Sequence, residues 1–394
     1  MKKKFACLAM AMVMVLSLAA CGGKKEEAPA AAPAESGSDS SVSVFKVGTI
    51  GPLSGDAAIY GQAVANGAKI AVDEINAAGG AIQFELQSQD DEADGEKSVN
   101  AYNTLMDWGM QVMVGPTTTG ASIAVSAQAN ADRTFMLTPS ASSVDVIDGK
   151  DNVFQVCFTA PTQGVASADY ISENMAGTKV AVIYRNDDAY SQGIRDTFVS
   201  EAADKGLEVV YEGTFTADTA TDFSVQLTGA QSAGADTVFL PIYYQPASVI
   251  LNQANAMGYE PTFFGVDGMD GILTMEGFDT SLAEGVMLLT PFSADAEDAR
   301  TQTFVKAYQD QFGETPNQFA ADAYDAVYIY AAALEAAGCT ADMSSADICE
   351  ALVGVMTTIS VDGLTGQGMT WDASGAVSKA PMAVIIENGT YVLP

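Results

Sequence analysis

The chain has 394 residues and carries 50 acidic side chains against 17 lysines and arginines, so its formal net charge at pH 7 is −33. This charge excludes nucleic acid as a partner, because nucleic-acid binding depends on basic side chains that neutralise phosphates. The chain has no histidine, which removes the commonest general base, the Ser/His and Cys/His nucleophile pairs and the usual zinc ligand.

The N-terminus has the pattern of a secretory signal. Lys2–Lys4 precede an apolar run over 5–16, which is too short to cross a bilayer as a permanent helix. The run ends in Leu18-Ala19-Ala20-Cys21, which resembles the lipobox of bacterial lipoproteins. We therefore expect residues 1–20 to be removed and Cys21 to carry a lipid. The alternative is an ordinary signal whose neighbouring cysteine is incidental.

Residues 21–43 predict a disordered tether after the lipidated cysteine. They contain mainly Gly, Lys, Glu, Ala, Pro and Ser without an apolar period, so they cannot bury enough surface to fold. The remaining stretch of about 350 residues is longer than one hydrophobic core usually serves, which favours two domains.

Strands and helices are expected to alternate along the first part of this stretch. The expected strands are 44–50, 82–86, 112–114 and 135–137, and the expected helices include Val64 to Ile75, a helix opened by Asp94 and one from about Ser122. A second series follows, with strands at 180–184, 208–211, 238–240 and 263–266 and helices near 192–203 and 223–232. This alternation predicts two α/β lobes with parallel sheets that are covered on both faces. In such sheets ligands bind beyond the carboxyl ends of the strands, so a cleft is expected between the lobes.

No motif points to catalysis or to a cofactor. The chain has no phosphate-binding loop, nucleophile elbow or dinucleotide fingerprint. The run Asp90–Gly95 is similar to a calcium loop, but Ala101 stands where the bidentate glutamate belongs, so we interpret Asp94 as a helix cap. An enzyme that uses carboxylates alone stays formally open. Cys339 and Cys349 are either bridged or two free thiols.

Six segments in order carry a resemblance to a known family. The chain resembles the substrate-binding proteins of branched-chain amino-acid ABC importers, the leucine/isoleucine/valine-binding type. The segments are Ile50–Gly55 with Tyr60-Gly61, Asp73–Gly80, Gly115–Gly120, Thr138–Ser142, Ala323–Val327 and Thr370–Gly375.

The resemblance implies a type I periplasmic binding fold, in which two Rossmann-like lobes close on a ligand about a hinge. Three segments would cross between the lobes, near Pro161, Pro291 and Gly368. Lobe 1 would contain residues 44–160 and 292–367, and lobe 2 residues 161–291 and 368–394.

The resemblance also implies a binding site. Thr119 would hold the ligand carboxylate at a helix N-terminus, where free N–H groups favour an anion. The backbone carbonyl of Ser140 would meet the ammonium, and Ser142 would offer its hydroxyl and N–H. Asp267 would pair with the ammonium once the lobes are shut, although it is shorter than the glutamate often found there. The remaining expected site residues are Tyr60, Thr117, Tyr190 and Tyr243.

The function implied is that of a non-catalytic, extracytoplasmic receptor that passes an amino acid, branched-chain or aliphatic, to the permease of an ABC importer. Thr117 replaces an apolar residue of leucine-binding members, so a more polar ligand would be tolerated. Alternatives are a binding protein for an amide, a urea-like solute or an aromatic acid, and a ligand sensor for a signalling receptor. We expect a monomer that touches the membrane only through its lipid, and neither metal nor cofactor.

Overall fold

The structure is a computed structural model, and it describes residues 42–394. The signal peptide, Cys21 and residues 22–41 of the tether, as expected from the sequence, lie outside the described residues. The first strand begins at Ser43, so the last residue assigned to the tether belongs to a strand instead.

The first sheet contains five parallel strands in the order β2-β1-β3-β4-β5. They are β1 (Ser43–Gly51), β2 (Ile82–Asp90), β3 (Val112–Val114), β4 (Phe135–Thr138) and β5 (Val153–Gln155). Side chains of β3 and β4 alternate between two apolar clusters, because successive residues of a strand point to opposite faces. Val112 and Val114 face one cluster, and Met113 faces the other.

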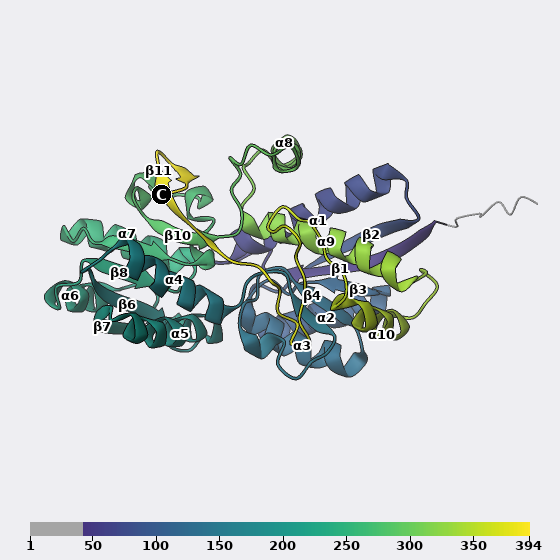
Figure 1. The fold of residues 1–394 in the computed structure, drawn as a ribbon, viewed down its shortest axis with the longest axis horizontal. Coiled ribbons are helices and arrows are strands. Elements are labelled where there is room, and N and C mark those ends of the chain that lie inside the picture. Colours follow the sequence, from purple (N-terminus) through teal and green to yellow (C-terminus); the bar gives the residue numbers. More distant parts are fainter. Residues whose placement is uncertain (1–41) are drawn as a thin grey trace, which may run out of the picture. The chain divides into compact units, whose positions relative to one another are not determined.

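Helices cover both faces of this sheet (Figure 1). α1 (Ala58–Ala78) and α9 (Gln318–Ala337) share one apolar cluster with the strands, and α2 (Gly95–Trp108) and α3 (Thr119–Asp132) share the other. α8 (Ala299–Phe312) contacts α1, and α10 (Ser345–Met356) contacts α9 and β4. Burial on both faces explains why the inner strands β3 and β4 are nearly continuous apolar runs, whereas β2, at the edge of the sheet, alternates with polar residues.

The second sheet contains seven strands in the order β12-β11-β10-β9-β8-β6-β7. Five of them are parallel, and β11 and β12 join antiparallel at one edge. The strands are β6 (Lys179–Arg185), β7 (Glu208–Phe215), β8 (Thr237–Leu240), β9 (Thr262–Gly265), β10 (Met287–Thr290), β11 (Met382–Glu387) and β12 (Thr390–Val392). The expectation of a wholly parallel sheet is therefore corrected at this edge, where a hairpin from the C-terminus pairs with β10.

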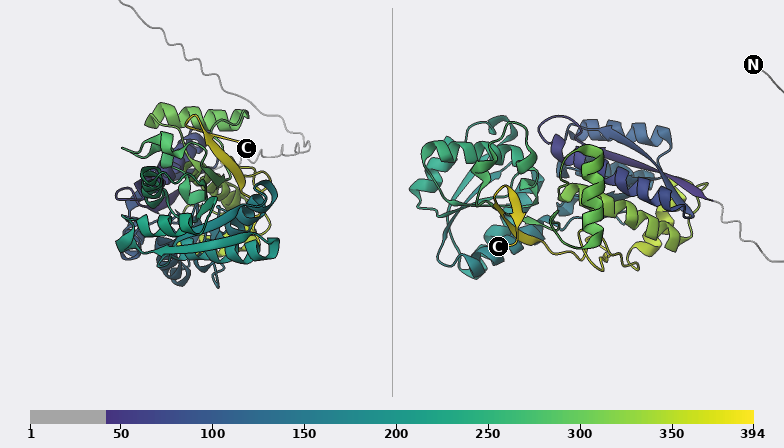
Figure 2. Two further views of the ribbon diagram at one scale, coloured as in Figure 1. Left: turned by 90° about the vertical axis from the view of Figure 1, so that its left-hand side faces the viewer. Right: turned by 90° about the horizontal axis from the view of Figure 1, so that it is seen from above.

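Helices also flank the second sheet on two sides, as the two views of Figure 2 and the apolar clusters show together. α4 (Ala160–Asn174) and α5 (Ala189–Lys205) belong to one cluster, and α6 (Ser224–Ser232) and α7 (Tyr244–Met257) belong to the other. Short 3-10 turns follow β9, and the first of them is Asp267–Met269.

The chain passes between the two sheets more than once. It leaves β5 of the first sheet for α4, and it leaves β10 of the second sheet for α8, which contacts α1. Near the C-terminus the indole N–H of Trp371 still donates to Gln155 O at 2.8 Å, before β11 joins the second sheet. The division into residues 44–160 with 292–367 and 161–291 with 368–394 stays a prediction.

Most expected elements are confirmed to within a few residues. Asp94 caps α2, because its side chain accepts from Lys97 N at 2.9 Å. The helix expected from about Ser122 begins three residues earlier, at Thr119. The reason is that Thr118 already has an extended backbone while its carbonyl accepts the bond from Ser122 N.

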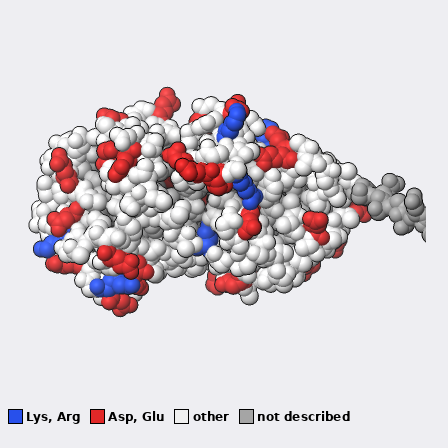
Figure 3. All heavy atoms as spheres, turned by 45° about the horizontal axis from the view of Figure 1, so that its top comes forward, with Lys and Arg blue, Asp and Glu red and all other residues white. Residues whose placement is uncertain are grey.

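Acidic side chains outnumber basic ones on the face shown in Figure 3. Several of the basic side chains are engaged in surface ion pairs, such as Lys69 with Asp73. Within residues 42–394, no helix combines the length and the apolar character needed to cross a bilayer.

Candidate functional site: a small cavity between strand ends

A small cavity lies where the carboxyl ends of strands from both sheets meet. The space inside it that a water-sized sphere can occupy is about 10 Å³. Six of the eight expected site residues line it, together with Thr118, Gly268 and Phe319; the six are Tyr60, Thr117, Ser140, Tyr190, Tyr243 and Asp267. That is about the space that one water molecule needs, so the lining side chains nearly close the cavity in this arrangement of the two sheets.

The first wall comes from the loops after β3 and β4. Ser140 Oγ donates to Thr117 O at 2.6 Å, and Thr117 Oγ1 donates to Ile50 O at 3.3 Å. These two hydroxyls therefore tie the loops to each other and to β1. Because the hydroxyl of Thr117 bonds to Ile50 O, this residue presents a less polar surface to the cavity than the sequence analysis expected from a threonine.

Three hydroxyls next to this wall have no partner among the described residues. They belong to Thr118 and Thr119, at the start of α3, and to Ser142. All three residues are buried. A buried hydroxyl without a hydrogen bond costs about 1–3 kcal/mol, so such a group in a native fold calls for an explanation. The first N–H groups of a helix also lack intrahelical partners, so donors gather at the beginning of α3.

The second wall is built around Asp267. The hydroxyl of Tyr190, on α5, donates to Asp267 Oδ1 at 2.5 Å and accepts from Gly268 N at 2.9 Å. The backbone N–H of Asp267 donates to Gln163 Oε1 at 3.2 Å. Its carbonyl accepts from Gln318 Nε2 at 3.1 Å. Asp267 is therefore held from three helices: its carboxylate from α5, and its backbone from α4 and α9.

Burial is the main influence on the charge state of Asp267, because only 2% of the surface of this residue is exposed. Desolvation raises the pKa of its carboxyl to about 7, although hydrogen bonds from Tyr190, Gln163 and Gly268 act to lower it and the negative charge of Asp322 raises it further. The pKa of Tyr190 is raised well above its usual value, chiefly by burial and then by the charge of Asp267. The acid thus titrates near neutrality beside a neutral phenol.

Tyr60 joins the two walls. It lies on α1, yet its hydroxyl donates to Gly268 O and accepts from Tyr244 N at 3.1 Å. Its ring packs against Tyr243 with centroids 5.4 Å apart and against Phe319 with centroids 4.5 Å apart. A polar bond and an aromatic cluster therefore close the cavity across the two sheets.

Thr119 and Ser142 do not line the cavity itself. Thr119 follows the lining residue Thr118, and the backbone of Ser142 accepts from Ala160 N at 2.7 Å where the chain leaves the first sheet. A larger hollow shares Thr118 and Tyr243 with the cavity and extends past Arg185 and Asp188.

Sequence reasoning missed Thr118, Gly268 and Phe319. Thr118 stands between two expected residues and Gly268 follows Asp267. Their position next to expected site residues could therefore have indicated them. Phe319 begins a helix capped by Asn317, whose side chain accepts from the N–H groups of Phe319 and Ala320. Nothing local marks this phenylalanine, because its neighbour Tyr60 is more than 250 residues away along the chain.

No group of histidine, cysteine and acidic side chains with the arrangement of a metal site occurs in residues 42–394. Cys157, Cys339 and Cys349 are free and buried. Of the two alternatives for Cys339 and Cys349, a disulfide or two free thiols, the structure therefore has the two free thiols. Burial raises the pKa of the Cys349 thiol to about 11.

The fold and the cavity together define a bilobal small-solute-binding protein, and comparison with known families agrees. Residues 44–390 match the family described as "Periplasmic binding protein", and the chain belongs to this family. The expected family and fold class are therefore confirmed.

Individual relatives narrow the comparison. The chain is 32% identical to Leu/Ile/Val-binding protein homolog 3 of Brucella melitensis biotype 1, over 78% of this chain and 82% of the relative. It is 30% identical to Leu/Ile/Val-binding protein BraC3 of Rhizobium johnstonii, over 75% of this chain and 80% of the relative.

A solved structure is similar over nearly its whole length. It is the branched-chain amino acid transporter substrate binding protein LivJ from Streptococcus pneumoniae in complex with isoleucine, with a TM-score of 0.79 and 30% identity. The match covers 88% of this chain and 97% of that one. The matched family and these relatives are binding proteins.

Proposed function

We propose that the chain is the extracytoplasmic substrate-binding protein of an ABC importer and that it captures a branched-chain or other aliphatic amino acid in the cavity around Asp267. It is not an enzyme. Two relatives are named Leu/Ile/Val-binding proteins, and the similar solved structure is a complex with isoleucine.

One observation carries the proposal beyond the family likeness. A buried carboxylate, Asp267, lines the same small cavity as Thr118, whose hydroxyl is buried and unpartnered at the start of α3. A carboxylate matches an ammonium, and a helix N-terminus with free donors matches a carboxylate. The two ends of the cavity thus complement the two charges of an amino acid.

The roles of the individual residues follow from this polarity. Thr119 and Ser142, whose unpartnered hydroxyls lie next to the cavity and do not line it in this arrangement, would receive the ligand carboxylate once the ligand enters. Asp267 with the backbone carbonyl of Ser140 would receive the ammonium. Tyr60, Tyr190 and Tyr243 enclose the side chain. Thr117 lies beside them with its hydroxyl turned to Ile50 O, which leaves its methyl group for an aliphatic ligand.

Capture would proceed by closure of the two lobes about the crossing segments. The bond from Tyr60 to Gly268 O and the contact of Gln318 with Asp267 O belong to the closed arrangement. Closure removes water from the charges and so strengthens their pairing. The loaded protein would then deliver its ligand to membrane permease subunits.

The N-terminal sequence completes the proposal. Cys21 would anchor the protein by lipid to the outer face of the bacterial cell membrane, and the segment between Cys21 and the first strand at Ser43 would let the binding domain reach a permease.

The test is a thermal-shift screen of the protein after unfolding and refolding, which strips bound solute. Leucine, isoleucine and valine should raise the unfolding temperature in a concentration-dependent way, because a ligand that binds only the folded state stabilises it. Amides, urea and benzoate serve as the comparison set. Stabilisation by one of these and by no amino acid would overturn the assignment of the solute.

A further inference from the structure

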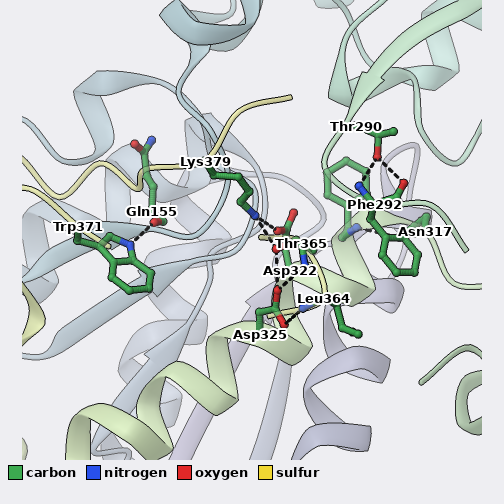
Figure 4. A network of polar contacts seen from close by, with 11 residues as sticks. Gln155, Thr290, Phe292, Asn317, Asp322, Asp325, Leu364, Thr365, Trp371 and Lys379 are labelled. Atoms are coloured by element: carbon green, nitrogen blue, oxygen red, sulfur yellow. Dashed lines mark hydrogen bonds and ion pairs between the residues drawn. The ribbon is translucent and has the colours of Figure 1, made fainter. Parts of the chain in front are cut away.

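A buried polar cluster lies behind the cavity and is not explained by ligand contact. Lys379 Nζ lies 2.5 Å from Asp322 Oδ1 and 2.7 Å from Thr365 Oγ1. Thr365 in turn donates to Asp325 Oδ2 through its hydroxyl at 2.6 Å and its N–H at 2.9 Å, and Leu364 N donates to Asp325 Oδ1 at 2.7 Å. Figure 4 shows Lys379 directed at Asp322 and Thr365, with Asp325 beneath them.

The cluster is unusual in its burial. The side chains of both Lys379 and Asp322 are 2% exposed. In the part of the chain that the structure describes, Lys379 is the one buried lysine or arginine, whereas several aspartates are buried. Removing an ion pair from water is costly, so a buried pair is weak evidence for added stability and its role has to be sought in its surroundings.

The cluster joins three parts of the chain, and one of them, α9, also contributes Phe319 to the cavity. Asp322 and Asp325 lie on α9, Thr365 lies on the segment after α10, and Lys379 lies three residues before β11 of the second sheet. One turn before Asp322 on the same face of α9, Gln318 donates to Asp267 O at 3.1 Å and its backbone N–H donates to Asp270 Oδ2 at 2.9 Å.

The charges of the cluster also act on the ligand site. The negative charge of Asp322 raises the pKa of Asp267. After burial, the charge of Asp322 is also the strongest influence that raises the pKa of the Cys157 thiol, followed by that of Asp267. Burial raises the pKa of Asp322 to about 6, and Lys379 opposes that rise. The titratable and charged groups that face Asp267 and Asp322 from the surrounding elements are Tyr60, Cys157, Tyr190, Tyr243, Asp270, Asp325 and Lys379.

We propose that Lys379 is a positioning residue of the ammonium site: it neutralises the acidic cluster of Asp322 and Asp325 behind the cavity and thereby keeps Asp267 available as a carboxylate for the ligand. The inference rests on the proposed function, since it assumes that Asp267 binds an ammonium. Lys379 itself touches no ligand. It acts because a carboxylate ionises less readily beside an unneutralised negative charge.

The test compares Lys379→Met, Lys379→Arg, Asp322→Asn and the double variant Lys379→Met/Asp322→Asn in the full chain. Lys306→Met is the matched control, because Lys306 pairs with Asp310 on an exposed helix face. The affinity for isoleucine is measured by calorimetry between pH 6 and pH 9, and each variant is compared with the wild type at the same pH.

Lys379→Met should weaken binding at pH 7 by about fivefold or more, since a one-unit rise in the pKa of Asp267 from about 7 lowers its ionised fraction from roughly one half to one tenth. The loss should shrink towards pH 9. Asp322→Asn should tighten binding at pH 6, because it removes a repelling charge. The double variant and Lys379→Arg should both return to within about twofold of the wild type, and Lys306→Met should have no effect.

A merely structural role gives a different pattern. An equal loss at every pH in Lys379→Met and in Asp322→Asn, without recovery in the double variant, would overturn the inference. Should Lys379→Met fail to fold, Asp322→Asn and the double variant still decide between these patterns, because they leave no buried carboxylate at position 322.

Asp267→Asn separates this inference from the proposed function. If Asp267→Asn binds isoleucine as tightly as the wild type, the ammonium assignment is wrong and the inference about Lys379 is wrong with it. If Asp267→Asn weakens binding and Lys379→Met does not, the proposed function stands and only the inference about Lys379 is wrong.

Discussion

Replacing Asp267 by Asn should stabilise the ligand-free protein and impair its binding. The carboxyl of Asp267 has a pKa of about 7 in the folded protein against 3.8 as the ordinary value, so the folded state holds a proton more tightly than the unfolded chain. The stability that this group contributes is therefore present at low pH and is lost as pH rises from about 4 to about 7. A difference of about three pKa units corresponds to about 4 kcal/mol at pH 8.

The amide of Asn carries no such ionisation cost, and its oxygen can still accept the bond from Tyr190. Asp267→Asn should consequently raise the free energy of unfolding at pH 8 by up to about 4 kcal/mol and change it little at pH 4. The same substitution should weaken ligand binding. An ammonium buried without its partner costs about 3–5 kcal/mol, so the affinity for isoleucine should fall by at least about 100-fold.

Urea denaturation of the stripped protein at the two pH values measures the first effect, and calorimetry measures the second. Asp310→Asn is the matched control, since Asp310 is exposed and pairs only with Lys306. The reasoning is refuted if Asp267→Asn lowers stability at pH 8 or leaves the affinity unchanged.

Three further substitutions test other parts of the site. Thr119→Val should weaken isoleucine binding about tenfold in calorimetry without lowering the unfolding temperature, because its hydroxyl has no partner within the described chain; undiminished affinity would contradict the carboxylate assignment. Tyr60→Phe removes the hydroxyl between Gly268 O and Tyr244 N, so thermal unfolding should show a loss of about 1–3 kcal/mol, together with weaker binding; a fully stable variant would speak against the bond across the two sheets. Cys21→Ser should move the protein from the membrane to the soluble fraction of fractionated cells, and retention that only detergent reverses would rule out the lipid anchor.

Most strands and helices could be predicted from the sequence, because the patterns that mark them lie within a few neighbouring residues. Buried strands such as 112–114 are short apolar runs, and Asp94 is an N-cap residue that indicates the start of the helix after it. The start of α3 was placed late, since the extended backbone of Thr118 is set by the loop and not by residue type. The antiparallel hairpin at the C-terminus lacked a signal, because direction in a sheet depends on the partner strand.

The site was predictable where a motif named its residues and unpredictable elsewhere. Tyr60, Tyr190 and Asp267 follow or flank strand ends, and the structure brings them to one cavity. Phe319 and Lys379 escaped notice, because their partners are distant along the chain: Lys379 lies 57 residues from Asp322. A lone lysine in a C-terminal segment is ordinarily a surface residue, and only the three-dimensional fold shows this one to be buried.

The central claim is that one small cavity holds both charges of an amino acid at once. The most direct measurement is calorimetric titration of the stripped protein with isoleucine, with N-acetylisoleucine, which lacks the ammonium, and with isoleucinamide, which lacks the carboxylate. Isoleucine should bind, and each derivative should bind at least about 100-fold more weakly, because a buried charged group would lose its partner in either case. Binding of either derivative as tightly as isoleucine would contradict the account.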